Sequence, residues 1–175
     1  MKILLTTLNA KYVHSNLALK YLYTVAAGEY SDLEVREFTI NNDPHYVYGE
    51  IVRGGYDLVC FSCYIWNISF VRELVPDLKK ILPQVEFWAG GPEVSYDAVE
   101  FLKKNPAFFG VMVGEGEETF RELLSCYRDE KDYHGVKGLL LPDGFTGSRR
   151  ELSMDELPFL YTDLQEYENR ILYYE

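Results

Sequence analysis

Short apolar runs alternate with segments of helical periodicity along most of the chain. Six runs have the length and composition of buried strands, and they cover residues 2–8, 34–40, 57–65, 85–89, 108–113 and 137–141. Between them, apolar residues recur at helical spacing in segments 15–30, 46–56, 69–82, 97–104 and 117–128. This alternation predicts strand–helix units joined by crossover connections.

Such an order predicts a doubly wound α/β fold: a five-stranded parallel sheet with helices on both faces. Segment 57–65 is apolar almost throughout, as expected for a strand that is covered on both sides. Asp97 and Glu100 have the spacing of a capping box, and Pro76 predicts a kink or a place near the first turns of its helix. We expect one domain over residues 1–141, followed by an acidic, aromatic linker over residues 142–175.

Composition and charge exclude several classes of partner. The net charge of −11 and a pI of about 4.8 argue against nucleic acid or an anionic membrane surface. No apolar run approaches the ~20 residues that a membrane span requires. The three cysteines form no disulfide framework, so we expect reduced thiols and a cytoplasmic location.

A ligand site is expected outside the carboxyl ends of the strands, where open parallel sheets bind their ligands. The loops after the first, third, fourth and fifth strands supply the candidate binding residues. These are Asn9, Ala10, Lys11 and Tyr12; Ser62, Cys63, Tyr64, Ile65 and Trp66; Gly90, Gly91, Pro92 and Glu93; and Gly114, Glu115, Gly116 and Glu117.

The residue types in these loops indicate the kind of ligand. Glycines in two adjacent loops bring bare backbone to the surface. Carboxylates and backbone carbonyls accept hydrogen bonds, which suits a ligand rich in amide donors, and the aromatic residues suit a ligand with a wide apolar face. The same carboxylates would repel a polyphosphate, and no G-x-G-x-x-G motif follows the first strand, which argues against a dinucleotide site.

No motif predicts catalysis or metal binding by this chain alone. Cys60 and Cys63 form a C-x-x-C, but Cys60 lies inside a strand, which favours a structural role. The three histidines, His14, His45 and His134, have no metal-ligand spacing. No Ser–His–Asp or Cys–His arrangement can be assembled, so we predict no catalytic residue.

Four loop sequences together resemble a known family. "LNAKYVHSNLALKYL", "FSCYIWN", "GGPEVS" and "GEGEETF" resemble the N-terminal cobalamin-binding domain of cobalamin-dependent radical S-adenosylmethionine enzymes. This class includes the proteins labelled anaerobic magnesium-protoporphyrin IX monomethyl ester oxidative cyclases. The resemblance covers about residues 1–140 and implies a flavodoxin-like fold with cobalamin across the carboxyl edge of the sheet.

The resemblance also implies roles for the loops. Gly90–Glu93 and Gly114–Glu117 would line the nucleotide tail and the corrin, residues 64–66 would lie under the ring face, and residues 9–12 would close the rim. The chain has no D-x-H-x-x-G motif, because His14 is followed by Ser-Asn-Leu-Ala, so no histidine would ligate cobalt.

The resemblance further implies a partner domain that the sequence lacks. There is no C-x-x-x-C-x-x-C motif, so the iron–sulfur cluster and S-adenosylmethionine would belong to a downstream radical domain. The segment containing "DELPFLYTDL" looks like the linker to it. We therefore expect a domain that positions cobalamin for methyl transfer or redox chemistry. The alternatives are a flavodoxin-like flavin-binding module and an interaction domain without ligand.

Overall fold

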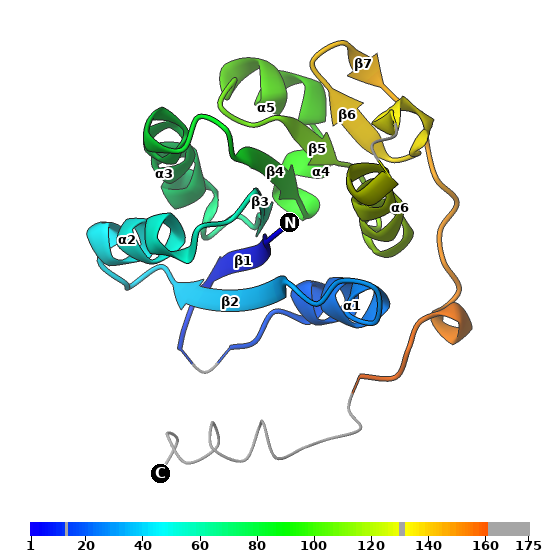
Figure 1. Ribbon diagram of the computed structural model, residues 1–175, viewed down its shortest axis with the longest axis horizontal. Helices are drawn as coiled ribbons and strands as arrows, with labels where there is room; N and C mark the ends of the chain where they lie inside the picture. Colours follow the sequence, from blue (N-terminus) through cyan, green and yellow to red (C-terminus); the bar gives the residue numbers. More distant parts are fainter. Residues whose placement is uncertain (13, 130–131, 161–175) are drawn as a thin grey trace.

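A seven-stranded sheet forms the centre of the molecule (Figure 1). The computed structural model describes residues 1–12, 14–129 and 132–160. The strands are β1 (Ile3–Asn9), β2 (Leu33–Thr39), β3 (Leu58–Ser62), β4 (Glu86–Gly90), β5 (Gly110–Met112), β6 (Leu139–Leu141) and β7 (Gly144–Phe145), in the order β2-β1-β3-β4-β5-β6-β7. The first five strands in this order, β2-β1-β3-β4-β5, are parallel to one another, which confirms the predicted five-stranded parallel sheet.

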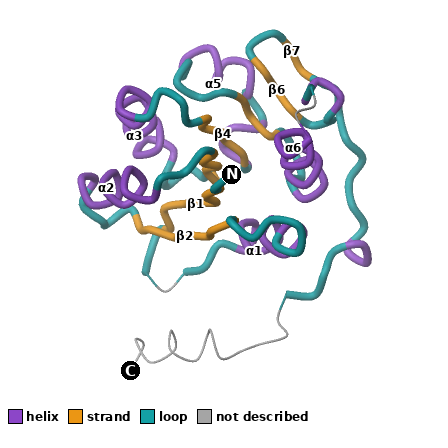
Figure 2. The backbone as a smooth tube through the Cα atoms, in the orientation of Figure 1, coloured by secondary structure: helices purple, strands orange, loops and turns teal. Residues whose placement is uncertain are grey.

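Helices cover both faces of the sheet. Figures 1 and 2 show α2, α3 and α5 on one side and α1 and α6 on the other. The helices are α1 (Leu17–Ala26), α2 (Pro44–Gly54), α3 (Ile68–Ile81), α4 (Pro92–Ser95), α5 (Ala98–Lys104) and α6 (Glu117–Asp129), with 3₁₀ turns at Tyr133–Gly135 and Met154–Glu156.

Each face of the sheet buries its own apolar core. Leu4, Val59, Phe87 and Val111 pack with helices α2, α3 and α5, whereas Leu5, Cys60, Trp88 and Met112 pack with α1 and α6. These strand residues alternate between the two cores because successive side chains of a strand point to opposite faces. All five residues of β3 are buried, as its near-continuous apolar sequence predicts.

Several predicted boundaries need correction. The first helix begins after an Asn16 cap and ends at Ala26, so it is shorter than 15–30. The third strand ends at Ser62 rather than residue 65. Pro76 lies in the interior of α3, and the Asp97 side chain makes no capping bond, so the capping box does not form.

The carboxyl-terminal part of the sheet also differs from the expectation. The strand predicted over residues 137–141 is antiparallel to β5, and β7 pairs with it as a short hairpin. Residues 144–145 therefore belong to the sheet, although the sequence around Gly144 predicts only a loop. Among the residues that the structure describes, we find no helix with the length and apolar character needed to cross a bilayer.

Candidate functional site

A cavity of about 560 Å³ opens at the carboxyl edge of β3, β4 and β5, on the face that α1 covers. It lies where the parallel sheet was predicted to bind a ligand. Nine of the predicted residues line it: Ser62, Tyr64, Gly90, Gly91, Pro92, Gly114, Glu115, Gly116 and Glu117. The loops after three strands thus meet at one cavity.

Gly90 presents bare backbone to this cavity for no internal structural reason. It is the last residue of β4 and pairs with Ser62 and Met112 on the neighbouring strands. A Cβ atom added to Gly90 would lie 3.6 Å from Met112, which is ordinary contact, and the backbone is not left-handed. The position could hold a side chain without strain, but that side chain would occupy the cavity.

Gly91 is required by the fold itself. Its φ is 100°, and an added Cβ would lie 2.6 Å from the Cys63 carbonyl oxygen. This backbone opens α4, where Pro92 takes the first helical position. The two adjacent glycines therefore serve different purposes.

Ser95 connects the two glycine loops. Its hydroxyl donates to the Gly91 carbonyl at 2.8 Å and accepts from the Gly114 amide at 3.4 Å. Gly114 has a φ of 82° with open space around it, and Gly116 lies opposite Leu22 of α1. The loops after β4 and β5 are thereby fixed relative to each other at the cavity.

Asn67 fixes the loop after β3. This side chain is fully buried, and its amide nitrogen donates at 3.1 Å to the Thr7 hydroxyl and to the carbonyls of Leu8 and Ser62. Its oxygen accepts from the Tyr64 amide at 2.8 Å. One buried amide thus joins the carboxyl ends of β1 and β3 and holds Tyr64 at the cavity.

The first loop lies apart from the cavity. Asn9 and Tyr12 line a second hollow of about 380 Å³ beside β2, together with His14. Asn9 is buried and donates to the His14 carbonyl at 2.9 Å and to the Glu37 carboxylate. Ala10 and Lys11 belong to the same loop and do not line the main cavity.

The residues after β3 divide into a buried part and an exposed part. Cys63 is fully buried in the core beside α2 and α3. Ile65 is 77% exposed, and the Trp66 ring stacks on the Tyr64 ring at 4.6 Å with an interplanar angle of 6°. These two rings form an aromatic surface beside the cavity, whereas Glu93 is exposed in the first turn of α4.

The thiols near the cavity stay protonated. Burial raises the pKa of Cys63 to about 12 and raises that of Cys60, which lines the cavity, well above its ordinary value. Neither is a thiolate at neutral pH. Within the described part of the chain, no group of three or more His, Cys, Asp or Glu side chains could hold a metal ion.

Sequence reasoning missed the apolar wall of the cavity. It is formed by Leu5, Ala18, Leu19, Leu22, Cys60, Phe61, Met112 and Val113, with Ser95 and Tyr96 from α4 and its end. Leu19 and Leu22 have the spacing of ordinary core residues, so their pattern gives no sign of a ligand. Gly90 and Gly116 add no side chains to the cavity, and Gly116 lies opposite Leu22.

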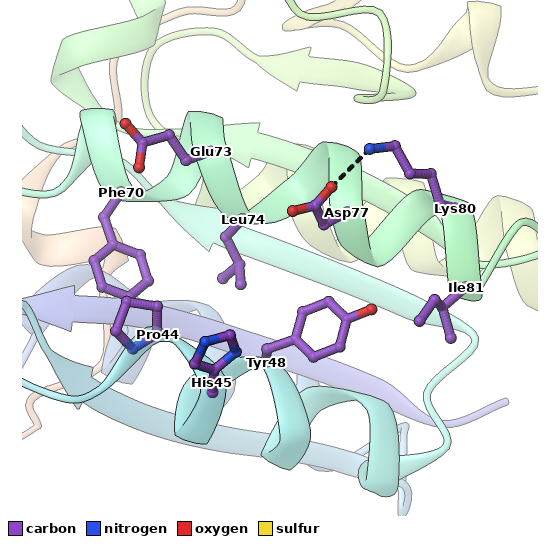
Figure 3. A pocket seen from close by; sticks show the side chains of 9 residues that line it. All are labelled: Pro44, His45, Tyr48, Phe70, Glu73, Leu74, Asp77, Lys80 and Ile81. Atoms are coloured by element: carbon purple, nitrogen blue, oxygen red, sulfur yellow. Dashed lines mark hydrogen bonds and ion pairs between the residues drawn. The ribbon is translucent and has the colours of Figure 1, made fainter.

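A separate groove lies on the other side of the sheet. It has a volume of about 470 Å³ between α2 and α3, and its walls are side chains from both helices (Figure 3). Figure 3 shows Tyr48, Phe70 and Leu74 along it, with Asp77 and Lys80 paired at 2.7 Å on its rim. No glycine lines this groove.

The fold and cavity define a class of protein, and a family comparison agrees. Residues 3–124 match the model of the B12 binding domain. The chain belongs to this family. It is a cobalamin-binding domain.

Individual relatives make the class more specific. Over 89 residues the chain is 36% identical to "Cobalamin-dependent radical SAM methyltransferase TokK" of Streptomyces tokunonensis and 34% identical to "2-(S-pantetheinyl)-carbapenam-3-carboxylate methyltransferase" of Streptantibioticus cattleyicolor. These matches cover 50% of this chain and 13% of the length of each relative.

A solved structure has the same fold. The cobalamin-dependent S-adenosylmethionine radical enzyme OxsB, with aqua-cobalamin and S-adenosylmethionine bound, superposes with a TM-score of 0.75 and 15% sequence identity. The match covers 97% of this chain and 25% of OxsB. The domain therefore resembles the cobalamin domain of radical enzymes, as the loop motifs predict.

Proposed function

We propose that this domain binds cobalamin at the carboxyl edge of its sheet and positions it for a radical S-adenosylmethionine enzyme. The observation that carries the proposal is Gly90, a strand-end glycine that no internal contact requires and that leaves a cavity open. The corrin would extend from this cavity over the two glycine loops and the stacked rings of Tyr64 and Trp66.

The residues of the cavity fit the nucleotide tail of cobalamin. The tail ends in a flat aromatic base, and the cavity offers an apolar wall from Leu5, Leu19 and Met112 against bare backbone at Gly90 and Gly116. Its volume of about 560 Å³ lies in the range of small-ligand sites. The exposed loop carbonyls and carboxylates can accept hydrogen bonds from the corrin's amides.

Among the described residues, no histidine lines the cavity. His14 lies at the hollow beside β2, His45 at the α2–α3 groove and His134 beside the β6–β7 turn. When bound, cobalamin supplies a cobalt centre that can carry a methyl group or exchange electrons. The chain's own residues would bind and orient it, and the buried thiols of Cys60 and Cys63 stay protonated and would not act as thiolate ligands.

Methyl transfer is the parent reaction that the relatives favour. The two relatives that match over 89 residues are both named as methyltransferases. We therefore place methyl transfer ahead of the oxidative cyclase chemistry that the loop motifs also suggest. The iron–sulfur cluster and S-adenosylmethionine would be held by a radical domain that acts with this one. The three free cysteines are consistent with the reducing, cytoplasmic location that we propose.

Gel filtration with two corrins tests the proposal. The protein is mixed with hydroxocobalamin or with cobinamide, which has the same ring but no nucleotide tail, and bound corrin is read from the visible spectrum of the protein peak. We expect about one cobalamin per chain and much less cobinamide. Absence of co-eluting cobalamin would contradict the function, whereas equal retention of both corrins would contradict the place of the tail.

A further inference from the structure

After the β6–β7 hairpin the chain returns to α6 and to the loop of residues 114–117. Residues 146–152, here called the return segment, follow β7 and run beside α6 (Figure 1). The sequence predicts only a loop and linker in this region. The return segment nevertheless makes specific contacts with the elements that form the cavity.

Arg149 is the main contact of the return segment with α6. Only 13% of its side chain is exposed. Its guanidinium donates to Glu118 at 2.9 Å and to both carboxylate oxygens of Glu122, and its Nε donates to the Thr119 hydroxyl at 3.2 Å. A planar guanidinium that is held by two carboxylates and a hydroxyl fixes orientation as well as position.

These contacts lie in the first turns of α6, directly after the 114–117 loop. Thr119 also donates to the Lys137 carbonyl at 3.1 Å, and Arg149 donates to the same carbonyl at 3.3 Å. Helix α6 begins at Glu117, and Glu117 and Gly116 both line the cavity. The position of Arg149 is therefore coupled to the position of the cavity loop.

One contact reaches the loop itself, and two more connect the return segment to the end of β5 through Gly138. The Leu152 amide donates to the Glu115 carboxylate at 2.6 Å. The Gly138 amide donates to the Gly147 carbonyl at 2.8 Å, and the Gly138 carbonyl accepts from the Val113 amide at 2.8 Å. The return segment thus contacts Glu115 directly and is linked to Val113, the residue before the loop, through Gly138.

We propose that the return segment is part of the cobalamin site and that Arg149 is a positioning residue for the 114–117 loop. This inference rests on the proposed function. Arg149 fixes the start of α6, and Leu152 orders the Glu115 side chain, so that the loop is already arranged before cobalamin arrives. Preorganisation of this kind raises affinity because less order has to be gained on binding.

The test compares Arg149→Leu with Arg128→Leu in the same chain. Arg128 lies on the same helix and pairs with Glu29 at 3.0 Å, at the end of α6 far from the loop. The measurements are the dissociation constant for hydroxocobalamin, the melting temperature and the amide exchange of residues 113–117 without ligand. We expect Arg149→Leu to weaken binding about tenfold and to speed exchange in the loop, as for loss of a charge-assisted contact. Arg128→Leu should change neither the dissociation constant for hydroxocobalamin nor the amide exchange of residues 113–117.

A charge exchange keeps the test decisive if Arg149→Leu is unstable. Arg149→Glu should weaken binding, and Arg149→Glu combined with Glu122→Arg should recover part of it. Recovery supports the inference, because a general loss of stability would not be reversed by restoring this one pair. If the wild type binds hydroxocobalamin and the Arg149 variants bind it equally well, the inference is overturned while the function stands. If the wild type binds none, the function itself fails.

Discussion

The cavity at the carboxyl edge and the groove between α2 and α3 lie on opposite faces of the sheet and are built differently. The groove between α2 and α3 is lined by side chains of two helices (Figure 3), whereas the cavity at the carboxyl edge has glycine backbone on one side and apolar side chains on the other. Imperfect packing of two helices is enough to produce the first. The second depends on a strand-end glycine that the fold does not need, which makes it the better candidate for a ligand.

The largest expected effect follows from filling the cavity. Gly90→Leu should leave the fold intact, because the added Cβ meets Met112 only at 3.6 Å, but its side chain would occupy the space of the nucleotide tail. We expect at least a 100-fold loss of hydroxocobalamin affinity, on the scale of losing a buried aromatic contact. Equilibrium dialysis measures it.

The matched control is Gly28→Leu. Gly28 is exposed, has open space around it and lies after the far end of α1. This variant should bind as the wild type does. If Gly90→Leu also bound hydroxocobalamin with wild-type affinity, the proposal that cobalamin binds in the carboxyl-edge cavity would be contradicted.

A second prediction concerns the Asn67 side-chain amide, which joins the carboxyl ends of β1 and β3 beside the cavity. Asn67→Ala should destabilise the protein by about 2–4 kcal/mol, because it removes the buried hydrogen bonds to the Leu8 and Ser62 carbonyls and the acceptor for the Tyr64 amide. Asn67→Asp should lower the free energy of unfolding at least as much, since a carboxylate can still accept from the Tyr64 amide but cannot donate to the carbonyls. Urea unfolding measures both, and wild-type stability of Asn67→Asp would contradict this role.

Gly91→Ala separates the two neighbouring glycines. The added methyl group would meet the Cys63 carbonyl at 2.6 Å in a left-handed conformation. We expect a loss of about 1–3 kcal/mol in unfolding free energy. Gly90→Ala should cost little stability. Equal melting temperatures for the two variants would show that they do not differ in this way.

The smallest effect concerns a site away from both hollows. The His134 ring lies between two carboxylates, with Nε2 at 2.8 Å from Asp143 and Nδ1 beside Asp132. Hydrogen bonding to Asp132, then to Asp143, raises the pKa of His134, and His134 in turn lowers the pKa of both carboxyl groups.

The signs of these shifts define a pH window. Because the pKa of His134 is raised in the folded protein, its ion pairs contribute stability below the ordinary pKa of 6.5. This contribution is lost as pH rises through the pKa of His134 in the folded protein. The two carboxylates contribute stability above their ordinary pKa of 3.8, and this contribution is lost as pH falls through their lowered pKa values. His134→Gln should therefore lower the melting temperature slightly near pH 5 and not at pH 8, with cobalamin binding unchanged. A larger effect at pH 8 would contradict the assignment.

Much of the fold could be predicted because periodicity reports burial. The sequence of β2 alternates between apolar and polar residues, the other four parallel strands are mostly apolar, and the order of strands and helices determines the layers. The strand at β6 was predicted, but the α4 turn and β7 were missed because elements of four and two residues carry no periodic signal.

The site could be predicted only in part. The glycines and their positions after predicted strands locate the loops after β4 and β5. They do not show that Gly91 is required by the fold and Gly90 is not, because the close contact between Gly91 and Cys63 forms only in the folded structure. Leu19 and Leu22 have the pattern of core residues. The roles of all the predicted contact residues with cobalamin stay predictions, and the first loop, residues 9–12, lies away from the cavity.

The most direct test is amide hydrogen exchange of the wild-type protein with and without hydroxocobalamin. We predict slower exchange in residues 62–64, 90–96 and 113–117, the loops that surround the carboxyl-edge cavity. Residues 45–48 and 70–81, which line the α2–α3 groove, should be unchanged. Protection confined to the groove, or protection at neither place, would contradict the proposal that cobalamin lies against Gly90 at the carboxyl edge.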